Sequence, residues 1–511
     1  MKTNSLYLPF LFLLLANFPL LAQEDGEYYS LKEALAADPL DVRSLDLSEE
    51  NFQTLPKSLK AFTNLQELSI NGIELTEIGD FWGAFPNLEY LDLDDNAIQV
   101  LPASLSQLSK LKTLYLASNQ LGPAALKQIA QLESLEELNL SRNVAMVEAD
   151  WNALVSLKRL KTLELLRLNL KECPKVLGQL PALNYLDLGE NKIEEIKLSF
   201  GANLQNLDLS SNPLQVLDIE AVGLKDLFLD RSEIQKLPKQ LPQLNYLSLD
   251  NCGLTAVTGQ IMAYTQLKEL SLIGNKIGEL PQSLTQLQQL EELYLSNNIL
   301  EEIPAFFAQI PNLTELHIDN NLVAKNNLRA PMKKLKLLYL SENITGPNFF
   351  KGQYMPALEE LYMSECLLFG TPDFTAATKL KSIYLDGNMI DKIHPSLAAL
   401  KQLEELDLSN NEKLIFPKGM ENLPLTSLNI SSCIGLDDLL DDDVVYEFPT
   451  FIAQLPKLES LEIANMPYNK LPDTWASKAT LLYLDVSGTK LSYDQIKAVG
   501  LYHDKCDIVW K

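Results

Sequence analysis

The sequence has few of the residues that build catalytic and metal centres. Its 511 residues include only three histidines and five cysteines, and His317, His394 and His503 are widely spaced. No phosphate-binding glycine loop, Cys-x-x-Cys pair or zinc-type cluster occurs. The strained nucleophile motif G-x-S-x-G is absent as well. We therefore expect a chain without enzyme activity, cofactor or metal.

Basic residues are also scarce. Lys and Arg total 42 against 68 Asp and Glu, a net charge of −26. Such an excess of acid argues against nucleic acid or anionic lipid as the main partner. It favours basic patches on proteins or peptides, or neutral ligands held by hydrogen bonds and stacking. The alternative is that the acidic charge only keeps a long surface soluble.

Long apolar runs are lacking after the first residues. Lys2 precedes an apolar stretch at 6–21, and a small residue stands before Gln23, which is typical of a secretory signal peptide. We expect residues 1–22 to be removed and the mature chain to be a monomer without a transmembrane span. It would then be secreted, periplasmic or at the cell surface. The first cysteine is Cys173, so we expect no lipid anchor on an N-terminal cysteine.

A repeat fills most of the remaining sequence. The pattern L-x-x-L-x-L-x-x-N recurs from Val42 onward, mostly every 22 or 23 residues, and a clean copy is LEYLDLDDNAIQVLP at 88–102. Leu-x-Leu places two side chains on one face of a strand. One turn cannot bury these groups, but stacked turns share a continuous core. The spacing predicts a right-handed α/β solenoid of about 20 leucine-rich repeats, with a parallel sheet on its concave side.

The ninth position of the repeat is polar in most turns. A buried amide there can bond backbone groups of neighbouring turns. Asn fills it at 96, 119, 143, 191, 212, 275, 298, 321, 343, 388 and 411. Cys252, Cys366, Cys433, Ser232 and Thr489 stand at the same position in other turns. Atypical turns are expected where the pattern is broken, at Glu50, Ile73, Leu168 and Met466.

Disulfides are not expected in this arrangement. Three cysteines fill the ninth position in turns that are at least three apart, about 14 Å at one strand spacing per turn. That separation is beyond disulfide reach. Cys173 and Cys506 are many turns apart. We predict that all five thiols are free.

Around the solenoid, predicted at 42–491, we expect a helical cap at 23–41 and a C-terminal cap at 492–511. Ser30 begins the N-terminal helix and Pro39 ends it. Pro123–Leu132 is predicted to be a helix on the convex side. The turns that start at 183, 204 and 224 have only 20 or 21 residues, so their convex segments are expected to be short.

An acidic insert at about 434–450 interrupts the solenoid. Its carboxylates are Asp437, Asp438, Asp441, Asp442 and Asp443. They suggest Ca²⁺, but the spacing and central glycine of a calcium loop are missing. A solvated acidic loop is the preferred interpretation, with contact to a cationic partner left open.

Both ends of the mature chain resemble those of a known group. The segment YYSLKEALAADPLDVRSLDLS resembles the opening of bacterial leucine-rich-repeat proteins, especially exported ones of Bacteroidetes type, and HDKCDIVWK resembles their closing strand. In that resemblance Ile508, Val509 and Trp510 cover the last turn. The likeness is specific for fold and implies little about function.

The candidate binding site is a column of rings on the concave face. The residue between the two strand leucines carries a ring in five successive turns: Tyr294, His317, Tyr339, Tyr362 and Tyr384. Carboxylates flank the column on one side at Glu269, Glu292, Glu315 and Glu360. On the other side they are Asp319, Glu342, Glu365 and Asp386.

Two interpretations of this column compete. Stacked like charges cost up to about 1 kcal/mol per opposed pair, and tyrosine is enriched at interface centres, so the column predicts a binding site for a protein or peptide with a basic surface. Alternatively, tyrosine is there because it suits strands and stacks on its neighbours. A glycan is the competing ligand, since rings flanked by carboxylates also bind sugars. A purely structural envelope component is the third possibility.

Two other constellations are weaker. His317 and Asp319, with Ser296 or Ser341 one turn away, allow a Ser-His-Asp arrangement to be drawn. Serine is ordinary at that repeat position, however, so catalysis is not expected. Asp187 and Asp208 fall in one column and could share a cation, but ordinary surface acids are the better interpretation.

Overall fold

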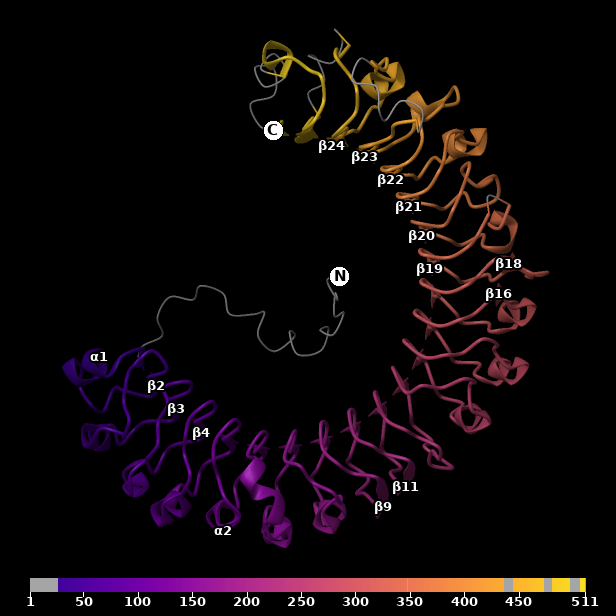
Figure 1. Cartoon of the computed structure of the whole chain (residues 1–511). Helices are drawn as coiled ribbons and strands as arrows, with labels where there is room; N and C mark the ends of the chain where they lie inside the picture. Colours follow the sequence, from indigo (N-terminus) through magenta and orange to yellow (C-terminus); the bar gives the residue numbers. More distant parts are fainter. Residues whose placement is uncertain (1–25, 347, 436–443, 473–479, 497–505, 511) are drawn as a thin grey trace. The chain divides into compact units, whose positions relative to one another are not determined.

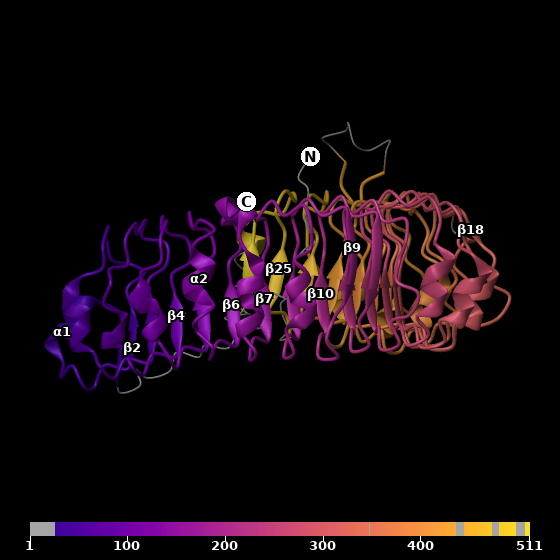
Figure 2. The ribbon, with the colours of Figure 1, turned by 90° about the horizontal axis from the view of Figure 1, so that it is seen from below.

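The computed structural model describes residues 26–346, 348–435, 444–472, 480–496 and 506–510. It divides into two units, one of 1–193 with 198–207 and one of 194–197 with 208–511. Within each unit, strands follow one another along the inner edge and helical segments lie on the outer edge (Figure 1). Neighbouring strands run side by side in the same direction (Figure 2).

Twenty-two short strands pair in parallel, one from almost every turn. In the first unit they are β1 (Glu27–Tyr28), β2 (Ser44–Asp46), β3 (Glu67–Ser69), β4 (Tyr90–Asp92), β5 (Thr113–Tyr115), β6 (Glu137–Asn139), β7 (Thr162–Glu164) and β8 (Tyr185–Asp187). The next strand is β10 (Asn206–Asp208). In the second unit they are β12 (Asp226–Phe228), β13 (Tyr246–Ser248), β14 (Glu269–Ser271), β15 (Glu292–Tyr294), β17 (Glu315–His317), β19 (Leu337–Tyr339), β20 (Glu360–Tyr362), β21 (Ser382–Tyr384), β22 (Glu405–Asp407), β23 (Ser427–Asn429), β24 (Ser460–Glu462), β25 (Tyr483–Asp485) and β26 (Asp507–Val509).

The outer segments are mostly single turns of 3₁₀ helix. The described α-helices include α1 (Leu31–Ala36) and α2 (Ala125–Ile129), and residues 493–496 are also α-helical. The 3₁₀ helices are Lys57–Ala61, Trp82–Ala84, Ala103–Gln107, Val144–Glu148, Trp151–Ser156, Lys175–Gln179, Gly259–Ala263, Gln282–Gln286, Ala305–Gln309, Gly352–Tyr354, Pro395–Ala399, Met420–Asn422 and Thr450–Gln454. None of the helices in the described ranges is long and apolar enough to cross a membrane.

Convex segments follow the length of each turn. The predicted helix at 123–132 is present but short, as α2. In the turns of 20 or 21 residues the outer segment is extended instead, as β9 (Glu195–Ser199) and β11 (Val216–Glu220), which pair with each other. A second pair of outer strands is β16 (Glu302–Ile303) and β18 (Lys325–Asn326). A shorter turn leaves too few residues for a helical loop, so the chain returns in an extended form.

The core consists of the repeat leucines. Leu91, Leu93, Leu293 and Leu295 have no exposed surface, as the alternation of Leu-x-Leu requires. Burying one such side chain contributes roughly 1.5–3 kcal/mol. Because every turn adds its leucines to those of the previous turn, the core continues through each unit.

Ninth-position asparagines join each turn to the one before it, as predicted. The Nδ2 of Asn298 donates to the carbonyl oxygens of Leu272, Leu295 and Ser296 at 2.9, 3.0 and 3.3 Å. Its Oδ1 accepts from the Ile277 amide at 3.0 Å. One side chain thus bonds backbone groups of two turns. The carbonyls of Leu272 and Leu295 are each shared with a second asparagine, Asn275 and Asn321, whereas Asn298 Oδ1 is the acceptor for the Ile277 amide.

Cysteines take over only the donor half of this role. The Sγ atoms of Cys252, Cys366 and Cys433 donate to the preceding turn's carbonyls of Leu229, Leu340 and Leu408 at 3.2, 3.2 and 3.0 Å. Burial raises the pKa of Cys433 to about 12, so its thiol stays protonated at neutral pH. All five cysteines are free thiols, as expected.

The eighth position has left-handed backbone in every turn from Gly72 to Gly488. Its amide donates to the next turn, as from Asn297 to the Asp319 carbonyl at 3.0 Å. After Ile73 and Leu168, where the ninth residue is apolar, a second left-handed residue follows, at Glu74 and Asn169. Two of the four turns predicted to be atypical thus have a second left-handed residue, and so does the turn of Cys366, at Leu367.

Both caps contain the expected elements. Ser30 Oγ accepts a hydrogen bond from the Glu33 amide at 3.3 Å and begins α1. The strand β26 pairs with β25 at the other end, although Val509 and Trp510 remain 42% and 44% exposed. The predicted signal peptide and residues 436–443 of the acidic insert, including its five aspartates, lie outside the described residues.

A ninth-position asparagine can be tested by truncation. Asn298→Ala should lower the free energy of unfolding by roughly 1–3 kcal/mol, because it leaves the buried Ile277 amide without the acceptor that Asn298 Oδ1 supplies. Asn298→Cys should cost less, since it retains a donor. The measurement is urea unfolding, with the exposed Asn327→Ala as control. A loss no larger than that of the control would contradict the role assigned to the amide.

Candidate ligand-binding surface

The five predicted rings lie together on the second unit, at equivalent positions of adjacent strands. Strand pairing sets Tyr294 opposite His317, His317 opposite Tyr339, and Tyr339 opposite Tyr362. Tyr384 follows Tyr362 in the same register. We call these five residues the aromatic ladder. Each side chain is half-buried.

The rings of the aromatic ladder stack on one another. Successive ring centroids are 4.4, 4.1, 4.2 and 4.5 Å apart, and from His317 onward the planes are within 12° of parallel. Each contact contributes about 0.5–1.5 kcal/mol beyond buried area. The inner ring faces are therefore covered by neighbouring rings. A ligand meets mainly ring edges and hydroxyls, and only the two end faces of the ladder are left for stacking.

Three tyrosine hydroxyls donate to carboxylates of the flanking column. Tyr294 Oη donates to Glu292 Oε2 at 2.7 Å, and Tyr362 Oη to Glu360 Oε2 at 3.0 Å. Tyr384 instead donates across to Glu405 of the next strand. Burial is the largest cause that raises the pKa of each of the three hydroxyls. The carboxylates come next for Tyr294 and Tyr384, whereas for Tyr362 a hydrogen bond with Tyr339 precedes the one with Glu360. The phenols are thus neutral donors at physiological pH.

The carboxylates on this side form an acidic column without basic partners. Pairing places Glu269 opposite Glu292, and Glu292 opposite Glu315. Burial raises the pKa of Glu269 to about 7, with Glu292 the next cause, and burial also raises the pKa of Glu315. In the described part of the chain, none of these carboxylates pairs with a lysine or arginine. We call Glu269, Glu292, Glu315, Glu360 and Glu405 the acidic column.

The residues immediately before the acidic column are charge-balanced. Lys268 pairs with Glu291 at 3.3 Å. Lys336 and Lys381 both reach Glu359, at 3.8 and 2.7 Å. Cations therefore alternate with acids one position away on the same strands, but are missing from the acidic column itself. The carboxylates of the acidic column therefore lack salt bridges although lysines are present on the same strands.

The acids on the other side of the ladder differ among themselves. Asp319 accepts a hydrogen bond from Ser296 Oγ at 2.6 Å, and Asp386 accepts one from Ser364 Oγ. Burial raises the pKa of Asp319. Glu342 and Glu365 are exposed. Only the last two extend freely toward solvent, so they are better placed to meet a ligand than the two aspartates.

His317 is a stacked, neutral ring. Its Nε2 is buried without a hydrogen-bond partner and lies 3.8 Å from Glu315 Oε2. Burial lowers its pKa to about 4. Ser296 donates to Asp319 rather than to the imidazole. No hydrogen bond joins His317 to Ser296, Ser341 or Asp319 among those present in the described residues, so the arrangement drawn from the sequence lacks the contacts of a catalytic triad.

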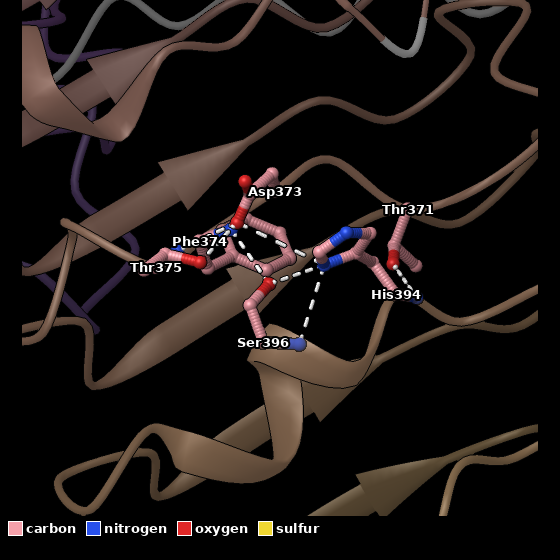
Figure 3. A network of polar contacts seen from close by, with 6 residues as sticks. All are labelled: Thr371, Asp373, Phe374, Thr375, His394 and Ser396. Atoms are coloured by element: carbon pink, nitrogen blue, oxygen red, sulfur yellow. Dashed lines mark hydrogen bonds and ion pairs between the residues drawn. The ribbon is translucent and has the colours of Figure 1, made fainter.

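A second histidine cluster lies on the outer side of the same unit (Figure 3). His394 Nδ1 is 2.8 Å from Ser396 Oγ and 3.8 Å from Asp373 Oδ1. Serine and aspartate thus meet the same ring nitrogen, whereas a triad uses both nitrogens. Ser396 Oγ also accepts from the Phe374 amide at 2.8 Å. The cluster joins two turns at the start of the 3₁₀ helix Pro395–Ala399.

The remaining sequence candidates have structural roles. Asp187 and Asp208 each accept a hydrogen bond from the amide two residues on, Gly189 and Ser210, at 2.7 and 2.8 Å. The described residues contain no group of His, Cys, Asp and Glu that could hold a metal ion. Glu405 is not among the candidates predicted from the sequence. Its alignment with Glu360, two turns earlier in the same column, could have identified it.

Glu269 gives the stability a pH dependence of known sign. Its pKa of about 7 lies above the ordinary 4.5, so the folded chain holds more protons between these values, and this contribution to stability is lost as the pH rises through them. Glu269→Gln should flatten the fall in melting temperature between pH 5 and 8. Melting curves across this range test it, with the exposed Glu133→Gln as control. An unchanged slope in Glu269→Gln would refute the assignment.

Comparisons with known proteins agree on the repeat. A family model described as "Leucine rich repeat" matches residues 63–121 and 265–323, and a second with the same description matches 203–225. The chain is 26% identical to chicken Toll-like receptor 2 type-2 over 41% of its length, covering 28% of that protein. It is 25% identical to the adenylate cyclase of Schizosaccharomyces pombe over 87% of its length, covering 27%. It is 28% identical to chicken Tsukushi over 48% of its length, covering 65% of that protein. The chain thus spans between about a quarter and two thirds of these relatives.

Two solved structures share the architecture. A leucine-rich-repeat protein of Leptospira interrogans is 26% identical with a TM-score of 0.51, over 94% of this chain and 99% of that one. Drosophila Toll, in its complex with Spatzle, has 16% identity and a TM-score of 0.61, over 89% and 76%, which shows likeness of fold alone. The repeat pattern, the parallel strands, the ninth-position amides and these matches together establish that the chain is a leucine-rich-repeat protein.

Proposed function

We propose that this chain is a non-catalytic binding protein that recognises a basic segment of a protein or peptide partner. The single observation that carries the proposal is the acidic column beside the aromatic ladder. Three of its carboxylates, Glu269, Glu292 and Glu315, oppose one another in register. None of the five pairs with a lysine or arginine within the described residues. Like charges in direct opposition are destabilising, and a basic partner would remove that cost on binding.

The ladder supplies the specificity of the proposed site. Tyrosine edges and hydroxyls offer a firm surface with little conformational entropy left to lose. Lysine or arginine side chains can lie along the ring edges while their charged ends reach the acidic column. The Toll structure likewise holds a protein partner, Spatzle, on a solenoid of this fold, which is a precedent for the scaffold and not for the partner.

The ladder geometry gives a glycan less support than the sequence did. Sugars bind aromatic residues through open ring faces, and here each inner face is covered by the next ring at 4.1–4.5 Å. Export remains part of the proposal and rests on the pattern of residues 1–22. We therefore propose recognition outside the cytoplasm, with a protein or peptide rather than a sugar as the ligand.

Neutralising the acidic column should separate stability from binding. The triple variant Glu292→Gln, Glu315→Gln and Glu360→Gln removes the repulsion, so its melting temperature should rise by a few degrees while capture of the partner falls at least tenfold. The assay is a pull-down from native extracellular and envelope extracts, with bound proteins and glycans identified. The matched control is Glu291→Gln, Glu359→Gln and Glu404→Gln, the same charge change at the residues that directly precede Glu292, Glu360 and Glu405. Equal capture by both variants would overturn the proposed site.

Added salt and removal of the tyrosine rings distinguish a basic protein ligand from a glycan. Changing Tyr294, Tyr339, Tyr362 and Tyr384 to Ser should abolish capture, whereas Tyr90→Ser with Tyr115→Ser, rings elsewhere on the concave side, should not. Capture of a basic protein should weaken strongly between 50 and 500 mM salt, because exposed charges are screened within about 8–10 Å at physiological salt. A captured glycan whose binding is insensitive to salt would favour the alternative ligand.

A further inference from the structure

Exposed aliphatic side chains form a row in the same turns as the aromatic ladder. They stand directly after the ninth position: Ile299, Leu322, Ile344 and Leu367, with exposed fractions of 48, 47, 50 and 54%. We call these four residues the rim row. The sequence analysis did not single them out, because the repeat pattern treats this position as variable. Contiguous exposed apolar surface of this kind marks interaction sites in soluble proteins.

The rim row is local to the ladder turns. The equivalent residue is Lys276 in the turn before it. In the following turns it is the half-buried Met389 and then Glu412. In the turns starting at 290, 313, 335 and 358, one turn therefore contributes both a ring on the strand and an aliphatic side chain at the rim. This coincidence over four successive turns points to one continuous surface.

Charge lies between the two apolar features. Glu342 and Glu365 occupy the eighth position, between ladder and rim row along the chain, and both are exposed. Five residues separate a ladder ring from the rim residue of its turn, at most about 17 Å of chain. Along the chain, each of these turns thus presents a ring first and an aliphatic group last, with a carboxylate between them in the turns of Glu342 and Glu365.

The spacing of the rim row favours a helical ligand. Adjacent turns of the solenoid are about 4.8 Å apart, and successive turns of an α-helix about 5.4 Å. Over three intervals the mismatch is under about 2 Å. Side chains on one face of a strand repeat every 6.6–6.8 Å, and would fall out of step by about 6 Å over the same length. A helix lying along the row can therefore place an apolar residue against each of the four side chains.

We propose that the rim row docks the apolar stripe of an amphipathic, basic α-helix, whose basic flank faces Glu342, Glu365 and the ladder. This inference rests on the proposed function and specifies its partner. An apolar stripe at i, i+3 or i+4 and i+7 matches the row, and lysine or arginine on the adjoining flank meets the carboxylates. The acids draw the ligand to the surface, and the rim row selects one with an apolar face.

The test uses two synthetic 18-residue helices with identical lysines, one with a leucine stripe and one with serine in its place. Wild-type protein should bind the leucine peptide at least tenfold more tightly by fluorescence anisotropy. The variant Leu322→Ser with Ile344→Ser should lose that preference but still bind both peptides weakly. Because these residues are exposed, its melting temperature should match that of wild type. The control is Val100→Ser with Val144→Ser, exposed aliphatic residues outside the ladder turns, and it should keep the preference.

The outcomes separate the two proposals. If the rim variant keeps the leucine preference, or if wild type shows none, the rim row is not a docking site, whatever the acidic column does. If the Glu292, Glu315 and Glu360 triple variant binds both peptides as wild type does, the proposed function fails while the leucine preference can still be measured. Loss of preference in the rim variant together with loss of overall affinity in the triple variant supports both.

Discussion

The register between the turns of this solenoid depends on hydrogen bonds that ninth-position side chains make to the neighbouring turn. Each buried amide ties its own turn to the carbonyl of one before it, as Asn298 does with Leu272, and no slip of a residue is possible without leaving backbone groups unsatisfied. Equivalent residues of successive turns must therefore stand one above the other. A surface column is the direct result of this constraint, because a residue type repeated in sequence becomes a stripe in space.

The same constraint explains why the candidate site carries a cost. Once register is fixed, Glu269, Glu292 and Glu315 cannot avoid one another by sliding. The pKa of Glu269 is raised first by burial and then by the opposed Glu292. One position earlier the chain answers the same constraint with alternating Lys and Glu. The contrast between balanced and unbalanced columns on the same strands is what separates an ordinary surface from one suited to a charged partner.

Much of this was predictable because the repeat converts sequence position into place. The solenoid, the parallel strands, the amide role of Asn298 and the alignment of Tyr294 with its four successors all follow from periodicity. Side-chain geometry did not follow. Whether the rings would stack or splay depends on rotamers, which periodicity does not encode, so the covered ring faces that weaken the glycan interpretation came only from the structure.

Other features were missed for identifiable physical reasons. The bond from Tyr384 to Glu405 crosses to the next strand. The bond from Ser296 to Asp319 joins the seventh positions of two adjacent turns, and the repeat pattern does not specify the residue types there. The rim row lies at a position that the pattern leaves free, where the sequence alone cannot tell an exposed aliphatic residue from a buried one. The conformation of outer segments such as β9 depends on the number of residues in the turn, and short turns return in an extended form.

The aromatic ladder also has a mechanical meaning. Its rings are 4.1–4.5 Å apart, closer than the roughly 4.8 Å between strands, since side chains on the inner side of a curve converge. Stacked rings are nearly in van der Waals contact and resist further compression. Within these turns the stacked rings therefore oppose an increase in the curvature of the solenoid, whereas they do not oppose a decrease. A ligand bound there would contact a surface that can flatten but resists stronger bending.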